Sequence, residues 1–401
     1  MAPTATKRLR IAAICTIYRE HSHAQHIVDR FLEGYHWMGK RHKPAMDLVS
    51  LYVDQVLQND LSRDRETRFA NLKIYPTIAE ALTRGGSGLA VDGVLLIAEH
   101  GDYGRTEKGQ TRYPRFRFFR EIVEVFRAGG RSVPVFNDKH LSWNWDEAIQ
   151  MVELSRQLGF AFMAGSSLPV TFRLPPVDMP LGAKVPEALS IAYGHVDSYD
   201  IHAIEMIQCM VERRAGGERG VQWLRAFRGE RFWEAQSRGA WSPQLFEAAL
   251  CRCHNLTLPM SGSSTVVPTI DEVKKTVKEP IAYQYQHIDG PKCTMILLNG
   301  LVGAFTFAAH VEGLPEPLST NMLLTMPWQL SSQANFFNPL VRHVEQMFLT
   351  GTPVYPVERT LLTTGLTAAG VDSLHAGQKH LDTPHLNIAY QPVEESLFAT
   401  E

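Results

Sequence analysis

The sequence lacks a charge excess, a long apolar run and an obvious set of paired cysteines. It has 40 lysine and arginine residues against 42 acidic residues, and the net charge of −2 argues against nucleic acid as the main partner. No stretch of about eighteen apolar residues occurs, so we expect no membrane-spanning helix. The five cysteines are odd in number and scattered. This pattern predicts reduced thiols and a cytoplasmic protein.

The amino-terminal segment also lacks the features of a signal peptide. Its apolar stretch from Ile11 to Ile17 is short, and the polar residues 18–21 follow it where a small-residue cleavage site would be expected. This stretch therefore predicts a strand. The chain has 401 residues, of which 44% are hydrophobic and 20% charged, and this size predicts two globular domains.

In the first half, short apolar runs alternate with amphipathic segments. We expect strands at 8–17, 46–53, 91–98, 133–136 and 160–164, and helices at 23–38, 78–82, 115–128 and 144–158. Continuous apolar runs are typical of strands that are covered on both faces. The alternation predicts a doubly wound parallel sheet of Rossmann-like type that closes near Gly165.

In the second half, longer strand patterns are separated by turn residues. We expect strands at 281–288, 293–298, 302–311 and 319–326, and helices at 198–214, 338–350 and 357–373. The predicted fold class is α/β plus α+β, in which the second domain is built on a mostly antiparallel open sheet. We expect a nucleotide-binding-type domain at 1–165, a substrate and oligomerisation domain at 166–355, and a carboxy-terminal helix and tail at 356–401 that pack back across both.

Two segments carry a family resemblance. Residues 133–154 followed by 162–165 resemble a strand, a Glu-Lys-Pro motif, a helix and a strand ending in glycine, and residues 198–205 resemble an Asp-x-Gly-x-His-x-x-Asp helix start. With the order of elements, these segments make the chain similar to the Gfo/Idh/MocA family of glucose–fructose oxidoreductase and inositol dehydrogenase. The resemblance implies a homo-oligomeric oxidoreductase that acts on a sugar, polyol or sugar derivative with NAD or NADP.

The resemblance also implies roles for individual residues. Lys139 keeps the lysine that family members use near the nicotinamide and the reacting hydroxyl. His202 falls on the family histidine and Glu205 on its second acid, while Ser198 and Asp200 stand where the family has aspartate and glycine.

The first turn departs from the family. The three glycine positions of Gly-x-Gly-x-x-Gly hold Cys15, Ile17 and Glu20, whose side chains should obstruct a pyrophosphate at the helix start. Asp54, at the end of the second strand, is still placed to bind ribose hydroxyls. Arg19 and Ser22 could hold a phosphate without glycines.

These considerations give a set of candidate site residues. Catalysis is assigned to Lys139, His202 and Asp200, because a histidine beside a lysine depresses the lysine pKa and leaves a neutral base. The candidates for cofactor binding are Arg19, Ser22, Asp54, Glu99 and His100, and those for substrate binding are His140, Asp102, Glu205 and Ser198.

Other interpretations remain open. The same lysine and histidine would suit a lyase, hydratase or isomerase of a keto-sugar, with a divalent metal on His100, His140, His202 and Glu205 as one version. A non-catalytic binding protein is a third hypothesis. The basic, aromatic segment 104–120 predicts a substrate-covering loop that leads into a helix, and the strand at 302–311 is a candidate subunit interface.

Overall fold

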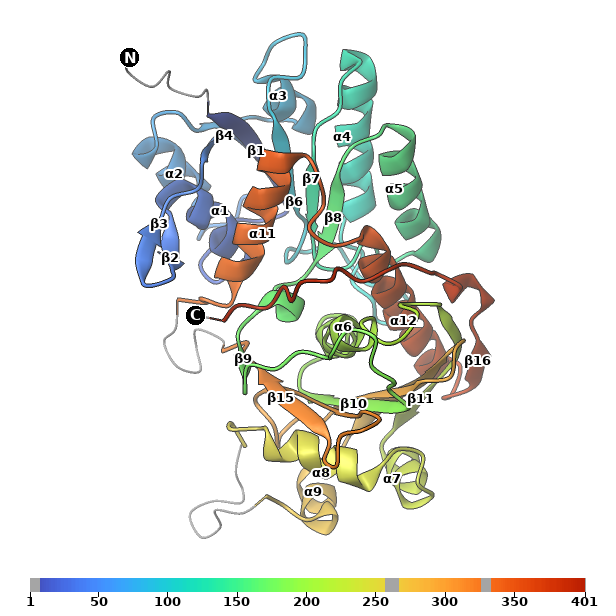
Figure 1. Ribbon diagram of the computed structural model, residues 1–401. Coiled ribbons are helices and arrows are strands. Elements are labelled where there is room, and N and C mark those ends of the chain that lie inside the picture. Colours follow the sequence, from blue (N-terminus) through green and yellow to red (C-terminus); the bar gives the residue numbers. More distant parts are fainter. Residues whose placement is uncertain (1–7, 257–266, 326–332, 401) are drawn as a thin grey trace.

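The computed structural model describes residues 8–256, 267–325 and 333–400. Two sheets lie one above the other in Figure 1, and α6 (Asp200–Val211) and α12 (Val357–His375) lie between them. Within the described residues, no helix combines the length and apolarity needed to cross a bilayer.

The first sheet is parallel and has six strands in the order β5-β4-β1-β6-β7-β8. Its strands are β1 (Leu9–Cys15), β4 (Met46–Val53), β5 (Lys73–Ile74), β6 (Gly93–Ile97), β7 (Val135–Asp138) and β8 (Phe162–Gly165). β6 is buried along its whole length, as its continuous apolar run predicts, and β7 is buried too, although it ends in Asn137 and Asp138. The predicted doubly wound sheet is confirmed.

Helices cover both faces of this sheet. One core contains α1 (His23–Glu33), and the other contains α3 (Ile78–Thr83), α4 (Arg115–Gly129) and α5 (Trp145–Gln157). The short α2 (Ser62–Arg68) precedes β5. Ser22 caps α1 by accepting a hydrogen bond from the Gln25 backbone N–H, which fixes where the helix starts.

The prediction of one helix over 23–38 is wrong at its end. α1 stops at Glu33 because Gly34 follows with φ +85°, where a Cβ atom would lie 2.4 Å from the carbonyl oxygen of His42. The chain then forms a hairpin of β2 (Tyr35–Trp37) and β3 (Lys40–His42).

The second sheet has eight strands in the order β16-β11-β12-β13-β10-β14-β15-β9. They are β9 (Arg173–Leu174), β10 (Glu187–Ala192), β11 (Val221–Arg228), β12 (Ile281–His287), β13 (Lys292–Leu297), β14 (Phe305–His310), β15 (Leu318–Met322) and β16 (His380–Asp382). The sheet is mostly antiparallel as predicted, and β10 and β13 form its parallel pair. The sequence patterns predicted β12 to β15 and missed the others; residue 326 of the predicted 319–326 strand lies outside the described residues.

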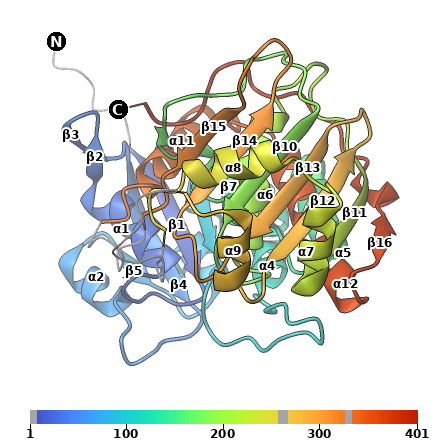
Figure 2. The ribbon, with the colours of Figure 1, turned by 90° about the horizontal axis from the view of Figure 1, so that it is seen from below.

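Helices also cover both faces of the second sheet. α6 is buried along its whole length on the side that faces the first sheet. On the other side lie α7 (Glu230–Ser237), α8 (Pro243–Cys251) and α9 (Ile270–Thr276), which Figure 2 shows in front of the strands. α8 packs on one face of β14, so the chain itself covers part of the strand 302–311 that was the candidate subunit interface.

α11 (Phe337–Thr350) was expected beside the second sheet and instead packs against α1. Its Phe337 ring stacks on His26 of α1 at a centroid distance of 5.1 Å. The apolar face of α11 therefore joins the core of the first sheet.

Candidate functional site

The carboxyl ends of the parallel strands meet α6 at the junction of the two sheets. Lys139 directly follows β7 and His202 lies in the first turn of α6. The two side chains are 3% and 5% exposed, and neither is a solvated surface group. The structure thus places the predicted pair in the interior, between the sheets.

Lys139 is held by an ion pair that the sequence did not predict. Its Nζ donates to Glu99 Oε1 at 2.8 Å and to the carbonyl oxygen of Ser198 at 2.9 Å. Glu99 Oε2 accepts a hydrogen bond from Arg115, whose side chain is fully buried. Two cations therefore share one buried carboxylate.

This carboxylate sets the protonation of the lysine. Burial lowers the pKa of Lys139, but the charge of Glu99 and its hydrogen bond outweigh burial and raise the pKa above its ordinary value of 10.5. Burial likewise disfavours ionised Glu99, yet Lys139 and Arg115 hold its pKa well below the usual range. The expectation that His202 depresses the lysine pKa is therefore wrong, and Lys139 is a cation at neutral pH.

His202 is oriented through one ring nitrogen. Its Nδ1 lies 3.0 Å from Ser166 Oγ and 3.5 Å from Glu205 Oε2. Glu205 also accepts the backbone N–H of Ser166 at 2.9 Å and the Ser166 hydroxyl. Burial and the charge of Lys139 lower the pKa of His202, and Glu205 offsets only part of this shift. His202 is therefore neutral at pH 7 and suited to accept a proton.

Several polar atoms around Lys139 have no hydrogen-bond partner among the described residues. They are His100 Nε2, His140 Nδ1 and Asp138 Oδ1. Burial and the neighbouring His23 lower the pKa of His100 to about 3, so its ring is neutral. Asp138 Oδ2 is already used, since it lies 2.7 Å from His23 Nδ1. Buried orphan atoms are uncommon, and their clustering here indicates a place where a ligand or water completes the bonding.

Asp54 and Arg19, expected to hold the ribose and the phosphates of a cofactor, are engaged with other protein groups. Asp54 accepts the hydroxyls of Tyr52 at 2.6 Å and Tyr103 at 2.8 Å, and Arg117 lies 3.2 Å from it. The Arg19 guanidinium donates to the carbonyl oxygen of Glu20.

A side-chain bridge crosses the end of β1. Gln55, after β4, donates from Nε2 to the carbonyl oxygen of Asp102 at 2.7 Å and accepts the Asp102 N–H at 2.9 Å. Since β4 and β6 flank β1, this Gln55–Asp102 bridge passes over the first turn, where the Gln55 N–H also donates to the Thr16 carbonyl oxygen. A Cβ atom on Gly101 would lie 3.4 Å from Ile17.

The fit to a dinucleotide differs between its two ends. The orphan atoms near Lys139 fit a polar ligand such as a carboxamide at the reacting end. The first turn lacks the open glycine backbone of a pyrophosphate site: Ile17 is buried there, and the Gln55–Asp102 bridge links the loops that follow β4 and β6 on either side of β1.

The other predicted site residues fall in three places. Ser198 contributes its carbonyl oxygen to Lys139, and His140 Nε2 lies 3.1 Å from Arg115. Asp200 is fully buried and accepts the hydroxyl of Tyr283 at 3.1 Å; burial raises its pKa to about 6. Asp102 has an exposed side chain beside the bridge.

No metal centre is formed by the expected set. Over residues 8–256, 267–325 and 333–400, no group of three or more His, Cys, Asp or Glu side chains is placed to hold a metal ion. Three of the four ligand candidates are engaged by protein groups: Glu205 and His202 by Ser166, and His140 Nε2 by Arg115.

Sequence reasoning missed Arg115 and Asp197. Arg115 lies on the apolar face of α4 with Phe118, Phe119 and Ile122, and an arginine on that face is the signal that could have revealed a buried ion pair. Asp197 Oδ2 accepts the backbone N–H of Thr111 at 2.7 Å. The loop from β6 to α4, expected to cover the substrate, is thus tied to the second half of the chain.

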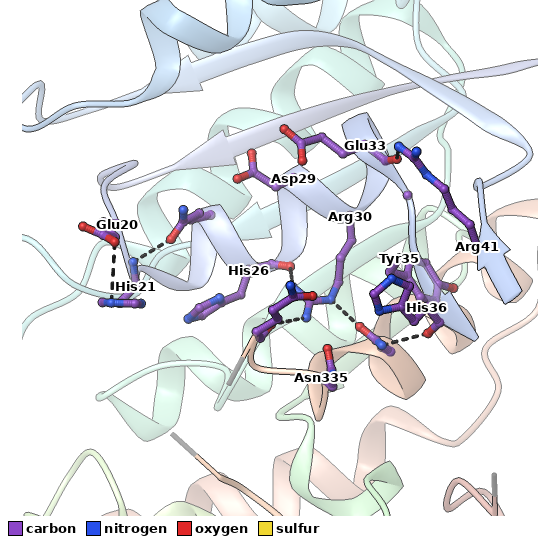
Figure 3. A pocket seen from close by; sticks show the side chains of 14 residues that line it. Glu20, His21, His26, Asp29, Arg30, Glu33, Tyr35, His36, Arg41 and Asn335 are labelled. Atoms are coloured by element: carbon purple, nitrogen blue, oxygen red, sulfur yellow. Dashed lines mark hydrogen bonds and ion pairs between the residues drawn. The ribbon is translucent and has the colours of Figure 1, made fainter. Parts of the chain in front are cut away.

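Two cavities lie near the junction. One of about 590 Å³ lies between this loop and the second sheet, and its lining includes Tyr113, Asp197 and Ser198. The other, of about 440 Å³, lies beside α1 (Figure 3). Its Arg30 is already bonded to the carbonyl oxygens of His26 and Ala334 and to Asn338. Neither cavity is lined by Lys139 or His202, but Ser198, whose carbonyl oxygen accepts a hydrogen bond from Lys139, lines the first. The first cavity is therefore the one that lies next to Lys139.

Comparisons by sequence found no match to a family model or to a curated protein. Solved structures match over nearly the full chain. GenD2 from gentamicin A biosynthesis, in complex with NAD, is 12% identical with a TM-score of 0.58 and covers 94% of this chain and 97% of its own. Myo-inositol dehydrogenase from Lactobacillus casei, in complex with NAD(H) and myo-inositol, is 11% identical with a TM-score of 0.55, covering 97% and 99%.

A third match is the myo-inositol dehydrogenase from Corynebacterium glutamicum, which is 10% identical with a TM-score of 0.52 and covers 94% and 99%. At these identities the likeness concerns the fold. The chain has the two-domain fold of the Gfo/Idh/MocA-type oxidoreductases, and the resemblance inferred from the sequence is confirmed at that level.

Proposed function

We propose that this protein, built on the Gfo/Idh/MocA fold, is an oxidoreductase that acts on a hydroxyl group of a sugar, polyol or sugar derivative with a nicotinamide cofactor. The observation that carries the proposal is the buried pair at the junction, in which Lys139 is a cation and His202 a neutral imidazole. An alcohol that loses its proton needs a base to accept that proton and a cation beside the oxygen to stabilise the negative charge that develops there. This pair supplies both.

The two residues have separate roles. Ser166 and Glu205 engage Nδ1 of His202, so Nε2 is the nitrogen left to accept the hydroxyl proton. Lys139 donates a hydrogen bond to the same oxygen and stabilises the negative charge that develops on it. Glu99 keeps the lysine charged throughout.

A bound nicotinamide would supply the hydride acceptor. Asp54 would hold its ribose, Arg19 and Ser22 its phosphates, and Glu99 and His100 would lie beside the ring. For this to happen, the Gln55–Asp102 bridge has to open. The second candidate is a non-redox lyase, hydratase or isomerase that uses His202 to remove a proton beside a carbonyl, since such a reaction needs no pyrophosphate on the first turn.

A turnover assay tests the proposal. The full chain is incubated with NAD or NADP and a panel of polyols, sugars and sugar acids, and cofactor reduction is followed by absorbance. We expect reduction with at least one substrate and a loss of about 10²-fold or more in His202→Asn. Lys274→Met, at an exposed lysine of α9 on the far side of the second sheet, serves as the control for Lys139→Met. Absence of reduction across the panel, together with carbonyl isomerisation or elimination, would favour the second candidate.

The proposal also includes a cytoplasmic location and a homo-oligomeric state. All five cysteines are free thiols, which supports a cytoplasmic enzyme. A homo-oligomer would need a surface other than the covered face of β14. Light scattering after size-exclusion chromatography measures the oligomeric state directly.

A further inference from the structure

The 590 Å³ cavity, whose lining residue Ser198 contacts Lys139, carries an excess of positive charge. Its lining includes Arg105 and Lys108 from the β6–α4 loop and Arg228 from the end of β11. Lys108 is paired with Asp372 at 2.6 Å. The guanidinium groups of Arg105 and Arg228 have no ion pair or side-chain hydrogen bond within the described part of the chain. Two cations are therefore available to a ligand.

The same cavity contains a buried acceptor that lacks a partner. Asp197 is 9% exposed; its Oδ2 accepts the Thr111 N–H, and its Oδ1 is buried with no partner among the described residues. An unsatisfied buried oxygen is costly, and a ligand hydroxyl would satisfy it. The cavity thus offers sites for an anionic group and for a hydroxyl group.

The cavity wall reaches the catalytic lysine. Ser198 lines the cavity, and its carbonyl oxygen lies 2.9 Å from Lys139 Nζ. A ligand whose one end lies at Lys139 would extend past Ser198 into the cavity.

We propose that this cavity binds the carboxylate or phosphate of an anionic, polyhydroxylated substrate, with Arg105 and Arg228 holding the anion and Asp197 Oδ1 hydrogen-bonded to a substrate hydroxyl. This inference rests on the proposed function, which places the reacting hydroxyl at Lys139 and His202. A sugar acid and a sugar phosphate present the same chemistry to two guanidinium groups.

Calorimetric titration of the full chain tests the anion site without any need for turnover. The probes are glucuronate, glucose 6-phosphate, inorganic phosphate and glucose. We expect at least one anionic sugar to bind and glucose to bind at least about tenfold more weakly. The two anionic sugars distinguish carboxylate from phosphate.

Variants locate the binding. Arg105→Gln and Arg228→Gln should each weaken the binding of the anionic sugar by about tenfold, and the double variant should weaken it further. Arg238→Gln, at an exposed position that ends α7 outside the cavity, is the matched control and should leave affinity unchanged. Equal binding of glucose, no binding of any anionic probe, or unchanged affinity in the double variant would overturn the proposal. Binding that depends on both arginines without cofactor-linked turnover would retain the anion site and reject the oxidoreductase.

Discussion

Glu99 and Lys139 form a buried ion pair, with 2.8 Å between Oε1 and Nζ, at the point where the two sheets meet. Each group stabilises the charge of the other against burial. In the proposed mechanism, this pair keeps Lys139 a cation and leaves proton removal to His202.

Glu99→Gln should lower the pKa of Lys139. The cationic lysine is the active form, so activity is lost as pH rises through its pKa, and the variant should lose activity at a lower pH than the wild type. Removal of one partner of a buried pair should also cost about 3 kcal/mol of folding stability. The pH profile of kcat and a urea unfolding curve measure the two effects. Glu107→Gln, on the exposed part of the same loop, is the control, and a profile identical to the wild type in Glu99→Gln would contradict this role.

Glu205→Gln should extend activity to lower pH. Neutral His202 is the active base, so activity falls as pH drops through its pKa, which already lies below 6.5. Glu205 raises that pKa, and its removal should move the acid limb further down while kcat falls because the ring is less firmly oriented. An acid limb that moves upward in kcat/KM measurements would contradict the assignment of His202 as the base.

Asp197 should make the protein less stable as pH rises. Burial and the charge of Asp200 raise the pKa of Asp197 from 3.8 to about 7, so the folded chain holds a proton that the unfolded chain releases. The stability that this bound proton contributes is fully present below about pH 4 and is lost as pH rises through about 7. In Asp197→Asn, which retains an acceptor for the Thr111 N–H, the free energy of unfolding should depend less on pH over this interval. If the free energies of unfolding of the wild type and the variant differ by a constant amount from pH 4 to 7, this ionisation is excluded.

Gln55→Ala should strengthen cofactor binding. The substitution removes both hydrogen bonds of the Gln55–Asp102 bridge, so a dinucleotide no longer has to break them, and we expect affinity to rise by about tenfold. Gln150→Ala, which removes a surface amide on α5, should leave affinity unchanged. Equal affinity in the wild type and Gln55→Ala would show that the bridge does not oppose the cofactor.

Much of the fold could be predicted because buried parallel strands leave continuous apolar runs, as in β6. The hairpin after Glu33 could not, since its cause is the close approach of Gly34 to the His42 carbonyl group, a contact between positions outside any local period. β11 was missed because its alternating residues mix arginine and glutamine with apolar side chains.

The candidate site, too, could be predicted only in part. Lys139 and His202 follow recognisable segments and are brought together as expected. The protonation of Lys139 could not be predicted, because it depends on Glu99, forty residues earlier in the chain, and on Arg115. The Gln55–Asp102 bridge likewise depends on a contact across β1, and no local sequence pattern predicts such a contact.

Titration of the purified protein with NADH and NADPH, followed by fluorescence and by thermal shift, tests the central claim most directly. The account predicts saturable binding of one or both, a raised unfolding temperature, and tighter binding in Gln55→Ala. Absence of binding at millimolar concentrations in both the wild type and Gln55→Ala would contradict the assignment of a nicotinamide-dependent oxidoreductase.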